Sequence, residues 1–381
     1  MHIFTYIDKD TTIYSRTANT GVATAERQHQ NTGLDSIIEL NKYLIDGEYY
    51  NSRILLKFDM TSLSSEINAG TIPTNAVHSL LLYTSQERDI PLKYDVHAYP
   101  ISESWEMGTG KSTDNPIVQD GASWKYKDGH LKGSGSQWAT SSFATDTDYT
   151  ATGSGDFGGT YYKGKAGDTD LYTHTQSFEY ETGDLTIDVS STINAIRNGS
   201  FVNEGFMIKR SDEDESNKKP LGNLQFFSRD THTMYLPRLE TKWDDSTWST
   251  GSLTALDVDD DIVLYMKGLK PEYKNKAVEK FRVTGRKRIV AKTYSTSSDY
   301  LNVQYLPSSS TYYSVIDAAT DETLIDFGDY TKVSCDSKGN FFNFRLNTLQ
   351  PERFYRFSFK VVSGSNVEFF DDGQFQFKVV R

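Results

Sequence analysis

The stretch from Asn51 to Met60 carries the clearest alternation of apolar and polar positions in the chain. Its alternate positions are apolar (Ile54, Leu56, Phe58, Met60) and charged (Arg53, Lys57, Asp59). A period of two is typical of a β-strand with one buried face. Leu55 is the single apolar residue on the charged face. We expect this strand to form the centre of a large N-terminal β-domain.

Shorter segments of the same kind continue through the first 245 residues and predict further strands. They are Met1 to Tyr14 with a turn at Asp8 to Asp10, Ser36 to Tyr43, Ala76 to Tyr83, Leu92 to Tyr99, Leu185 to Val189, Glu204 to Arg210, Leu224 to Ser228 and Met234 to Trp243. Thr84 to Pro91 is polar and predicts a hairpin loop. Ser190 to Gly199 predicts a short helix with a serine N-cap and a glycine stop.

The segment 105–170 shows no periodicity and is dominated by Gly, Ser, Thr and Asp, with Trp105, Trp124 and Trp138 set in it. Such a length without a regular pattern is unusual inside a compact domain. It is either a mobile surface loop or a long excursion pinned by its tryptophans. Three tryptophans are out of character for a disordered segment, so the pinned excursion is favoured.

Composition changes after the polar segment Asp244 to Gly251, which predicts a boundary between domains at 1–245 and 246–381. Short strands follow at spacings of about 8 to 12 residues, as in a sandwich. They are expected at Ile262 to Tyr265, Tyr300 to Leu306, Tyr312 to Asp317, Glu322 to Phe327, Tyr330 to Cys335, Phe341 to Leu346, Arg353 to Val362 and Gln374 to Val380. The class predicted is all-β, with a second, smaller immunoglobulin-like β-sandwich.

Charge and cysteine content exclude several classes of function. The net charge of −12 argues against a nucleic-acid-binding protein. Cys335 is the one cysteine, so an intrachain disulfide and a cysteine-based zinc site are ruled out. Asp8, Lys9 and Asp10 interrupt the N-terminus too early for a signal peptide. No apolar run approaches the ~18 residues of a membrane span, so no membrane partner is expected.

Four motifs could bind a metal or cofactor, and a structural role is the simpler interpretation of each. They are the pair His78 and His97, the acidic loop Ser211 to Lys219, the cluster Asp257, Asp259, Asp260 and Asp261, and the string Gly153-Ser-Gly155-Asp-Phe-Gly158. The histidines lack a third ligand at suitable spacing. The acidic loop lacks the spacing and glycine of a calcium loop, so a solvated turn is expected. The glycine string lacks the strand and helix of a dinucleotide site. We expect no cofactor and leave a metal site open.

One basic strip stands out in this acidic chain, between Lys270 and Lys292. Its central residues are Lys280, Arg282, Arg286, Lys287 and Arg288. Phe281 and Val283 alternate with Lys280 and Arg282, which places the charges on the outer face of a strand. A solvated sheet face and a dock for an acidic partner, such as a neighbouring subunit, are equally good interpretations.

Two resemblances bear on function. SRILLKFDM (Ser52 to Met60), EGFMIKR (Glu204 to Arg210) and FSRDTHTMYLPRLETKW (Phe227 to Trp243) resemble the DNRLRE-type β-sandwich family. So does the pattern of Trp105, Gly108, Gly110, Lys111, Asp120, Gly121, Trp124 and Trp138. The resemblance implies a jelly-roll-like sandwich of adhesins, carbohydrate-binding modules and phage particles. The tract from Gly285 to Phe357 resembles C-terminal domains of virion proteins of tailed phages, notably contractile-tailed cyanophages.

Three hypotheses of function follow. The leading one is a non-enzymatic virion component of the neck, collar, baseplate or fibre, assembled in the host cytoplasm, whose partners are other virion proteins and copies of itself. The alternative is a carbohydrate-binding module that holds a surface glycan on an aromatic platform of Trp105, Trp124, Trp138, Tyr161 and Tyr162. An enzyme with paired carboxylates is the third. No catalytic string such as H-E-x-x-H, G-x-S-x-G or a P-loop is present, so we expect no enzyme.

Overall fold

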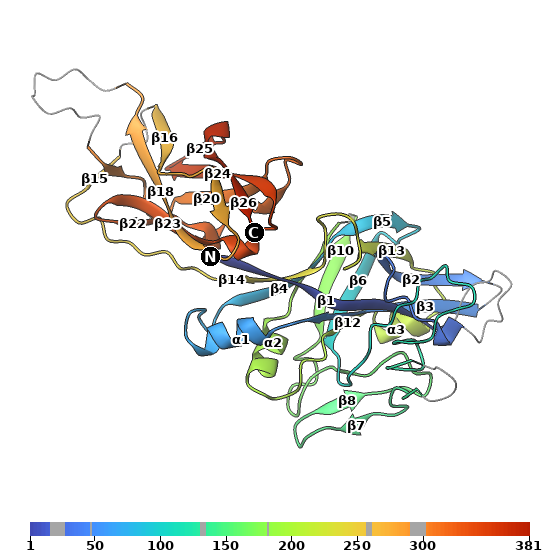
Figure 1. The fold of residues 1–381 in the computed structure, drawn as a ribbon. Coiled ribbons are helices and arrows are strands. Elements are labelled where there is room, and N and C mark those ends of the chain that lie inside the picture. The colour runs from blue at the N-terminus through green and yellow to red at the C-terminus, as the bar shows by residue number, and fades with distance from the viewer. Residues whose placement is uncertain (16–26, 46–47, 130–134, 181–182, 257–260, 290–301) are drawn as a thin grey trace, which may run out of the picture. The chain divides into compact units, whose positions relative to one another are not determined.

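The computed structural model describes residues 1–15, 27–45, 48–129, 135–180, 183–256, 261–289 and 302–381 (Figure 1). These residues divide into two compact units, Thr5–Glu240 and Met1–Phe4 with Thr241–Arg381. Strands dominate both units, which confirms the all-β prediction. The α-helices α1 (Thr61–Asn68), α2 (Ser190–Arg197) and α3 (Asp212–Ser216) are short and lie in the first unit.

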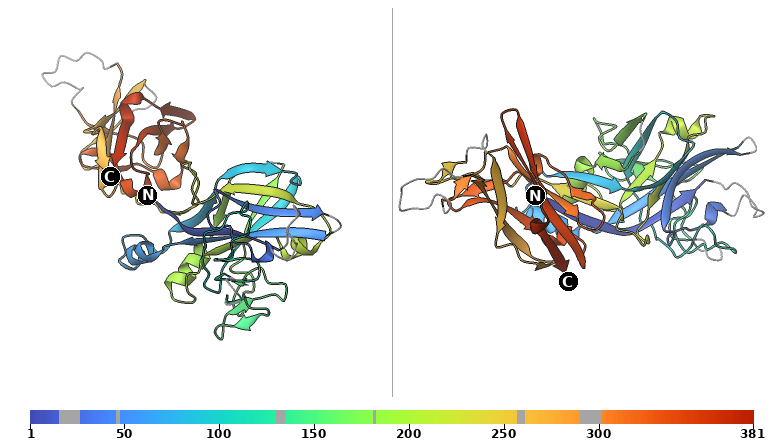
Figure 2. Two further views of the ribbon diagram at one scale, coloured as in Figure 1. Left: turned by 45° about the vertical axis from the view of Figure 1, so that its right-hand side comes forward. Right: turned by 90° about the horizontal axis from the view of Figure 1, so that it is seen from above.

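The first unit is a jelly-roll-like sandwich whose main strands form one continuous 11-stranded sheet (Figures 1 and 2). In one part of this sheet, β13 (Gly222–Phe227) lies between β2 (Ile37–Ile45) and β5 (Thr84–Arg88), and β2 also pairs with β3 (Glu48–Phe58). From β3 the sheet continues through β12 (Phe206–Lys209) and β6 (Lys93–Pro100) to β10 (His174–Glu179). At the other end of the path, β4 (Val77–Leu82) pairs with β11 (Leu185–Asp188). Most neighbouring strands are distant in sequence, so long-range pairings hold the sheet together.

Two further strands extend the jelly roll. The long strand β1 (His2–Tyr14) pairs with β3, and β14 (Arg238–Lys242) lies between β1 and β4. The turn expected at residues 8–10 is wrong, because β1 continues through it with a register shift between Ile7 and Lys9, a β-bulge. Strand β14 starts only after Pro237, whose carbonyl accepts a hydrogen bond from Ile7 N at 3.1 Å.

Two connections differ from the sequence expectation. Thr84–Arg88 is a strand rather than a hairpin loop; its side chains are exposed or half-buried, so it shows no apolar periodicity. Helix α2 forms as predicted, but its N-cap is Val189, and Asp188 Oδ1 instead accepts a hydrogen bond from Ser190 N at 2.9 Å. Gly199, with φ of +75°, ends the helix as expected.

The second unit is an immunoglobulin-like sandwich. One sheet holds β16 (Ile262–Lys267), β18 (Val278–Lys287), β23 (Gly339–Arg345) and β22 (Ser334–Asp336). In the same sheet β19 (Gln304–Tyr305) pairs with β18, and β15 (Thr254–Ala255) pairs with β19. The other holds β17 (Glu272–Lys274), β26 (Gln376–Val380), β24 (Arg353–Ser363), β20 (Thr311–Asp317) and β21 (Thr323–Ile325), with β25 (Asn366–Phe370) beside β24. In immunoglobulin nomenclature these are the ABED and GFC sheets, with β17 as an added A′ strand.

Aromatic side chains fill the core of this sandwich. Tyr313 stacks on Phe342 with ring centroids 4.3 Å apart, and Phe357 stacks on Phe377 at 4.8 Å. Tyr355, near the start of β24, donates a hydrogen bond from its hydroxyl to the Gln350 carbonyl at 2.8 Å. This is the tyrosine corner of immunoglobulin-like folds, which ties the start of a central strand to the preceding turn.

The first four residues belong to the second unit rather than to the domain that follows them in sequence. The Met1 amino group donates hydrogen bonds to Asp245 Oδ1 at 2.9 Å and to the Tyr330 carbonyl at 2.8 Å. Thr348 Oγ1 donates to the His2 carbonyl at 3.0 Å. The chain therefore passes between the two units twice, after Phe4 and after Glu240.

Candidate functional site

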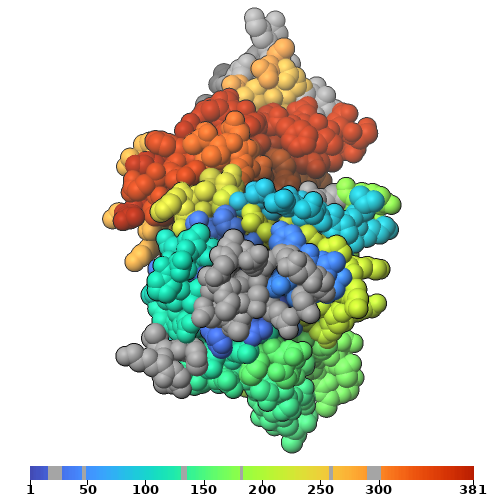
Figure 3. Space-filling model, turned by 90° about the vertical axis from the view of Figure 1, so that its right-hand side faces the viewer, coloured from blue at the N-terminus to red at the C-terminus, as the bar shows by residue number. Residues whose placement is uncertain are grey.

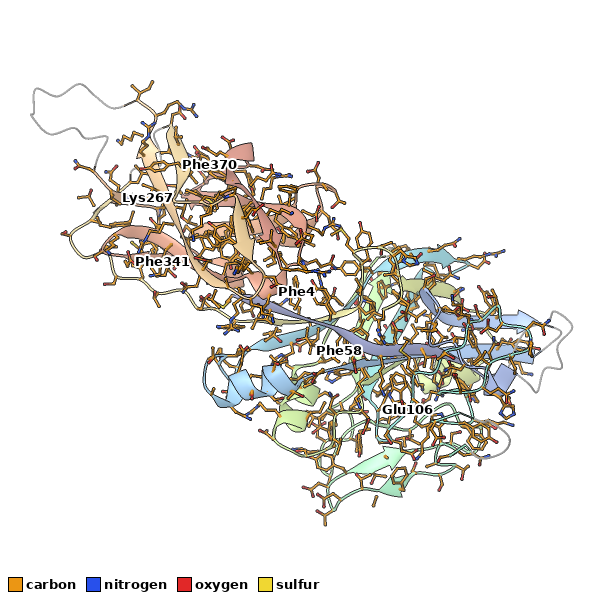
Figure 4. All side chains as sticks on the ribbon, viewed as in Figure 1. Phe4, Phe58, Glu106, Lys267, Phe341 and Phe370 are labelled. Atoms are coloured by element: carbon orange, nitrogen blue, oxygen red, sulfur yellow. The ribbon has the colours of Figure 1, made fainter. Side chains whose placement is uncertain are left out.

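The excursion that connects β6 to β10 packs on the face of the sheet that carries Leu55 of β3, Tyr99 of β6 and Met207 of β12. It carries the short strands β7 (Phe143–Ala144), β8 (Thr150–Thr152) and β9 (Tyr161–Tyr162). Its residues Trp105, Met107, Ala122, Trp124, Trp138 and Tyr161 form one buried cluster with Ile13, Leu55, Tyr99, Ile101 and Met207. Leu55 is thus the apolar residue on the charged face of β3 because the excursion packs on it. Figure 3 shows residues of the excursion in teal and green on the surface of the first unit, and Figure 4 labels Glu106 of the excursion and the buried Phe58 of β3.

Each tryptophan of the excursion is tied to the backbone by its indole N–H. Trp105 donates to the Glu204 carbonyl at 2.9 Å, Trp124 to Asp156 at 2.6 Å and Trp138 to Ser123 at 2.9 Å. A buried indole needs such a partner, and here the partners hold distant loops together. The excursion is pinned, as the tryptophans predicted.

Asn31 forms hydrogen bonds at the centre of the motif that contains Gly108, Gly110 and Gly121, and we call this arrangement the Asn31 hub. Its fully buried amide donates to the carbonyls of Met107 and Ala122, at 2.6 and 3.0 Å, and accepts from the N–H groups of Gly33 and Gly110, at 3.1 and 2.9 Å. A Cβ on Gly108, whose φ is +74°, would stand 2.4 Å from the Asn31 side chain. The glycines of this motif therefore serve close packing, and sequence spacing gave no sign of Asn31.

A buried charge network lies beside this cluster. Arg53 donates to both carboxylate oxygens of Glu215, from Nε at 3.0 Å and from Nη2 at 2.7 Å. Lys209, fully buried, contacts Glu215 Oε2 at 3.2 Å and Asp212 Oδ1 at 2.5 Å. Burial lowers the pKa of Lys209. Burial also disfavours the charged form of Asp212, but hydrogen bonds from Lys163 and Lys209 hold the pKa of this carboxyl well below its ordinary value.

The network fixes the acidic segment Ser211 to Lys219, which we expected to be a solvated turn. Its residues 212–216 instead form α3, where the Ser211 hydroxyl accepts a hydrogen bond from Asp214 N at 2.9 Å. Lys42 binds the Asn217 carbonyl at 2.7 Å and also the Asp214 carbonyl. The expectation was wrong because the carboxylates neutralise cations on distant strands. The signal was present: EGFMIKR puts Lys209 inside a strand just before the acidic run.

A hollow of about 560 Å³ opens beside the excursion, above this network. Its lining includes polar groups and aromatic rings: Ser15, Gln28, Tyr49, Asn51, Trp124, Lys125, Asp156, Phe157 and Glu215. Arg53 lies over the Trp124 ring at 4.8 Å and donates to the Gly158 carbonyl at 2.6 Å. Phe157 has a φ of +66°, a strained value for an aromatic residue. Arg53 and Lys209 hold Glu215, whereas Asp156 forms no ion pair with another described residue, so the hollow offers a binding surface with Asp156 as its available carboxylate.

The predicted glycan platform lies inside the protein. Trp105, Trp124, Trp138, Tyr161 and Tyr162 are all at most 5% exposed. The three tryptophans and Tyr161 belong to the buried cluster described above, and Tyr162 stacks on Phe201 in a second buried cluster, so the five rings form no exposed plane on which a sugar could stack. Of these five predicted platform residues, Trp124 alone is among the residues that line the hollow.

The basic strip lies on β18 and just beyond it, with Phe281 and Val283 buried and Lys280 and Arg282 outside, as predicted. Arg282 forms a two-pronged ion pair with Asp336, at 3.0 and 2.8 Å, and Lys280 lies 3.4 Å from the same carboxylate. Arg288 pairs with Asp261 at 2.7 Å. Arg286 and Lys287 also have partners. Acidic side chains of the same unit therefore balance much of the charge proposed for docking.

Of the motifs that could bind a metal or cofactor, the histidine pair lies in strands and the glycine string in a turn of the first unit. His78 lies in β4 and His97 in β6, which are separated in the sheet by β12, β3, β1 and β14. The glycine string 153–158 forms a turn in which Phe157 N donates to the Ser154 carbonyl. Asp257, Asp259 and Asp260 lie outside the described residues. The described residues contain no group of three or more potential metal-ligating side chains.

Comparison with known proteins gives no family assignment. No protein-family model matches the chain, and a search of curated proteins finds no match. Among the helices that the structure describes, none has the length and apolar character needed to cross a membrane.

Proposed function

We propose that this protein is a non-enzymatic structural component of a tailed-phage virion, in the neck, collar or baseplate or associated with a fibre. It acts through contacts with other virion proteins and with copies of itself. The observation that carries the proposal is the double passage of the chain between two β-sandwiches, after Phe4 and after Glu240. Because two covalent connections join the units, a force that pulls them apart is shared between both connections. In a symmetric assembly, many weak contacts between copies add up to a stable structure.

The rigidity of the first unit supports this proposal. A scaffold must present the same surface in every copy, and here the 105–170 excursion is fixed by three indole hydrogen bonds, the Asn31 hub and a buried ion-pair network. A loop of this length would otherwise be a mobile part of the surface. The second unit offers strand edges and exposed aromatic side chains for contact.

Analysis of purified particles tests the proposal. Virions of the phage whose genome encodes this chain are purified by density gradient, quantified by mass spectrometry and imaged by electron microscopy. We expect a constant number of copies per particle and two adjoining sandwich densities that fit the two units. A chain that remains in the soluble fraction of the lysate, with no copies in intact particles, would contradict the proposal.

The hollow favours glycan binding as a second candidate function, because Tyr49, Trp124 and Phe157 border it together with hydrogen-bonding groups. A glycan array with the purified protein tests it. Binding to one polysaccharide that is lost in Asp156→Ala and kept in Asp146→Ala, an exposed aspartate of the same excursion, would support this function. Absence of binding, or equal binding by both variants, would oppose it.

A further inference from the structure

Strand β25 forms an open edge of the second unit. It pairs with β24 from Phe359 opposite Phe370 to Ser363 opposite Asn366. No other strand of the described residues pairs with β25. An edge of this kind presents unpaired backbone N–H and C=O groups, which another extended chain can bind. Figure 1 shows β25 beside β24.

The outer face of β25 is apolar. Val367 and Phe369 are 47% and 62% exposed and lie opposite Val362 and Lys360 of β24. Phe369 contacts Phe327, with ring centroids 5.7 Å apart. Natural edge strands usually carry lysine or proline that discourages strand addition. The sequence of β25, NVEFF, has neither.

The inner face of β25 carries one carboxylate. Glu368 lies opposite Val361, which is 2% exposed, so its side chain is directed to the core side of the sheet. It is half-buried, and no ion pair joins it to another described residue. An inward charge on an edge strand opposes the addition of a purely apolar strand. It also opposes a second copy paired symmetrically about Glu368, because two carboxylates would then stand opposite each other.

We propose that β25 binds an extended segment of a partner protein as an additional strand. The segment is apolar where it meets Val367 and Phe369 and has Lys or Arg opposite Glu368. Backbone hydrogen bonds supply affinity, and the basic residue supplies selectivity because it converts the unpaired carboxylate into a cross-strand ion pair. This inference rests on the proposed function, since it names the surface by which a structural protein would contact its neighbour.

Peptide binding to the full-length protein tests the inference. The probes are two nine-residue peptides in which Val and Phe alternate with Lys or, in the second peptide, with Glu. We expect the dissociation constant measured by fluorescence anisotropy to be at least tenfold lower for the Lys peptide. Amide chemical-shift changes should cluster on residues 366–370. Glu368→Lys should reverse the preference, so that the Glu peptide binds more tightly.

Two surface variants distinguish binding at this edge from non-specific hydrophobic binding elsewhere on the protein. Phe369→Ser should weaken binding of the Lys peptide at least tenfold. Phe354→Ser is the matched control and should leave binding unchanged, because Phe354 is 50% exposed on the same face of β24 but lies opposite Lys378 of β26, away from the edge. Thermal unfolding of each variant verifies that it is folded.

Three outcomes would overturn the inference. They are equal affinity for both peptides, equal losses in the two serine variants, and self-association that Phe369→Ser abolishes without any peptide binding, which would make a second copy the occupant. Peptide binding and particle analysis are independent tests. If the protein were absent from virions, the proposed function would be refuted, but the measured peptide specificity of β25 would still stand.

Discussion

Replacement of Glu215 by glutamine should destabilise the first unit strongly. The carboxylate accepts hydrogen bonds from Arg53 and lies 3.2 Å from Lys209, and the side chains of these three residues are 10%, 10% and 0% exposed. Glutamine keeps the volume and one acceptor oxygen but removes the charge. Breaking one side of a buried ion pair costs about 3 to 5 kcal/mol. Because Lys209 keeps Asp212, we expect about 3 kcal/mol.

Urea unfolding followed by tryptophan fluorescence measures this loss, since Trp124 lies over Arg53. With a typical slope of about 1 to 3 kcal/mol per molar urea, the midpoint of the first unit's transition should fall by roughly 1 to 3 M. The loss should persist in about 1 M salt, which screens exposed pairs far more than buried ones.

Glu213→Gln is the matched control for this experiment. Glu213 belongs to the same helix, is exposed and has no ion pair among the described residues. Its replacement should change the free energy of unfolding by no more than about 0.5 kcal/mol. A Glu215→Gln loss below about 1 kcal/mol, or one equal to that of the control, would refute the assignment of Glu215 as the anion that stabilises the buried cations.

Three further predictions concern stability. Trp138→Ala should lower the free energy of unfolding, measured in urea, by about 3 to 5 kcal/mol because the side chain is 1% exposed. The control Trp248→Ala, at a 37% exposed site, should lower it by about 1 kcal/mol or less. Similar losses in the two variants would contradict the pinned excursion. Burial raises the pKa of Asp10 to about 7, so the folded state keeps a proton that the unfolded state releases near pH 4, and stability falls as the pH rises from about 4 through 7. Asp10→Asn should therefore raise the free energy of unfolding at pH 8 by roughly 2 to 4 kcal/mol and leave it nearly unchanged at pH 4; an equal effect at both pH values would count against it. Tyr355→Phe should cost about 1 to 2 kcal/mol because it removes the hydrogen bond to the Gln350 carbonyl. Tyr313→Phe removes a buried hydroxyl that has no hydrogen-bond partner among the described residues, so it should be neutral or stabilising.

Local patterns were sufficient to predict most strands that have one buried face. The alternation through Ile54, Leu56 and Phe58 correctly placed a central strand whose inward residues are at most 1% exposed. The same argument missed Thr84–Arg88, because neither face of this strand is uniformly apolar. It also mistook three charged residues at 8–10 for a turn, since a β-bulge leaves no distinct mark in the composition.

The candidate site was harder to predict because its contacts join residues far apart in the chain. Arg53 and Glu215 are 162 positions apart, and no motif in the sequence links them. The aromatic residues 105, 124, 138, 161 and 162 were predicted as a glycan platform, with anchoring of the excursion as the alternative, because sequence could not tell a buried anchor from an exposed platform. Leu55 was the informative exception: an apolar residue on a charged face signals that something covers that face.

The attachment of Met1 to Phe4 to the second unit has a consequence for how this protein can be divided or recombined. A gene fragment that starts at residue 241 encodes every other part of that unit and omits the segment bonded to Asp245, Tyr330 and Thr348. Such a fragment leaves the Tyr330 carbonyl and the Thr348 hydroxyl without these partners. The second unit therefore cannot be moved to another protein as one continuous segment. A fusion protein that contains it must include both Met1–Phe4 and Thr241–Arg381.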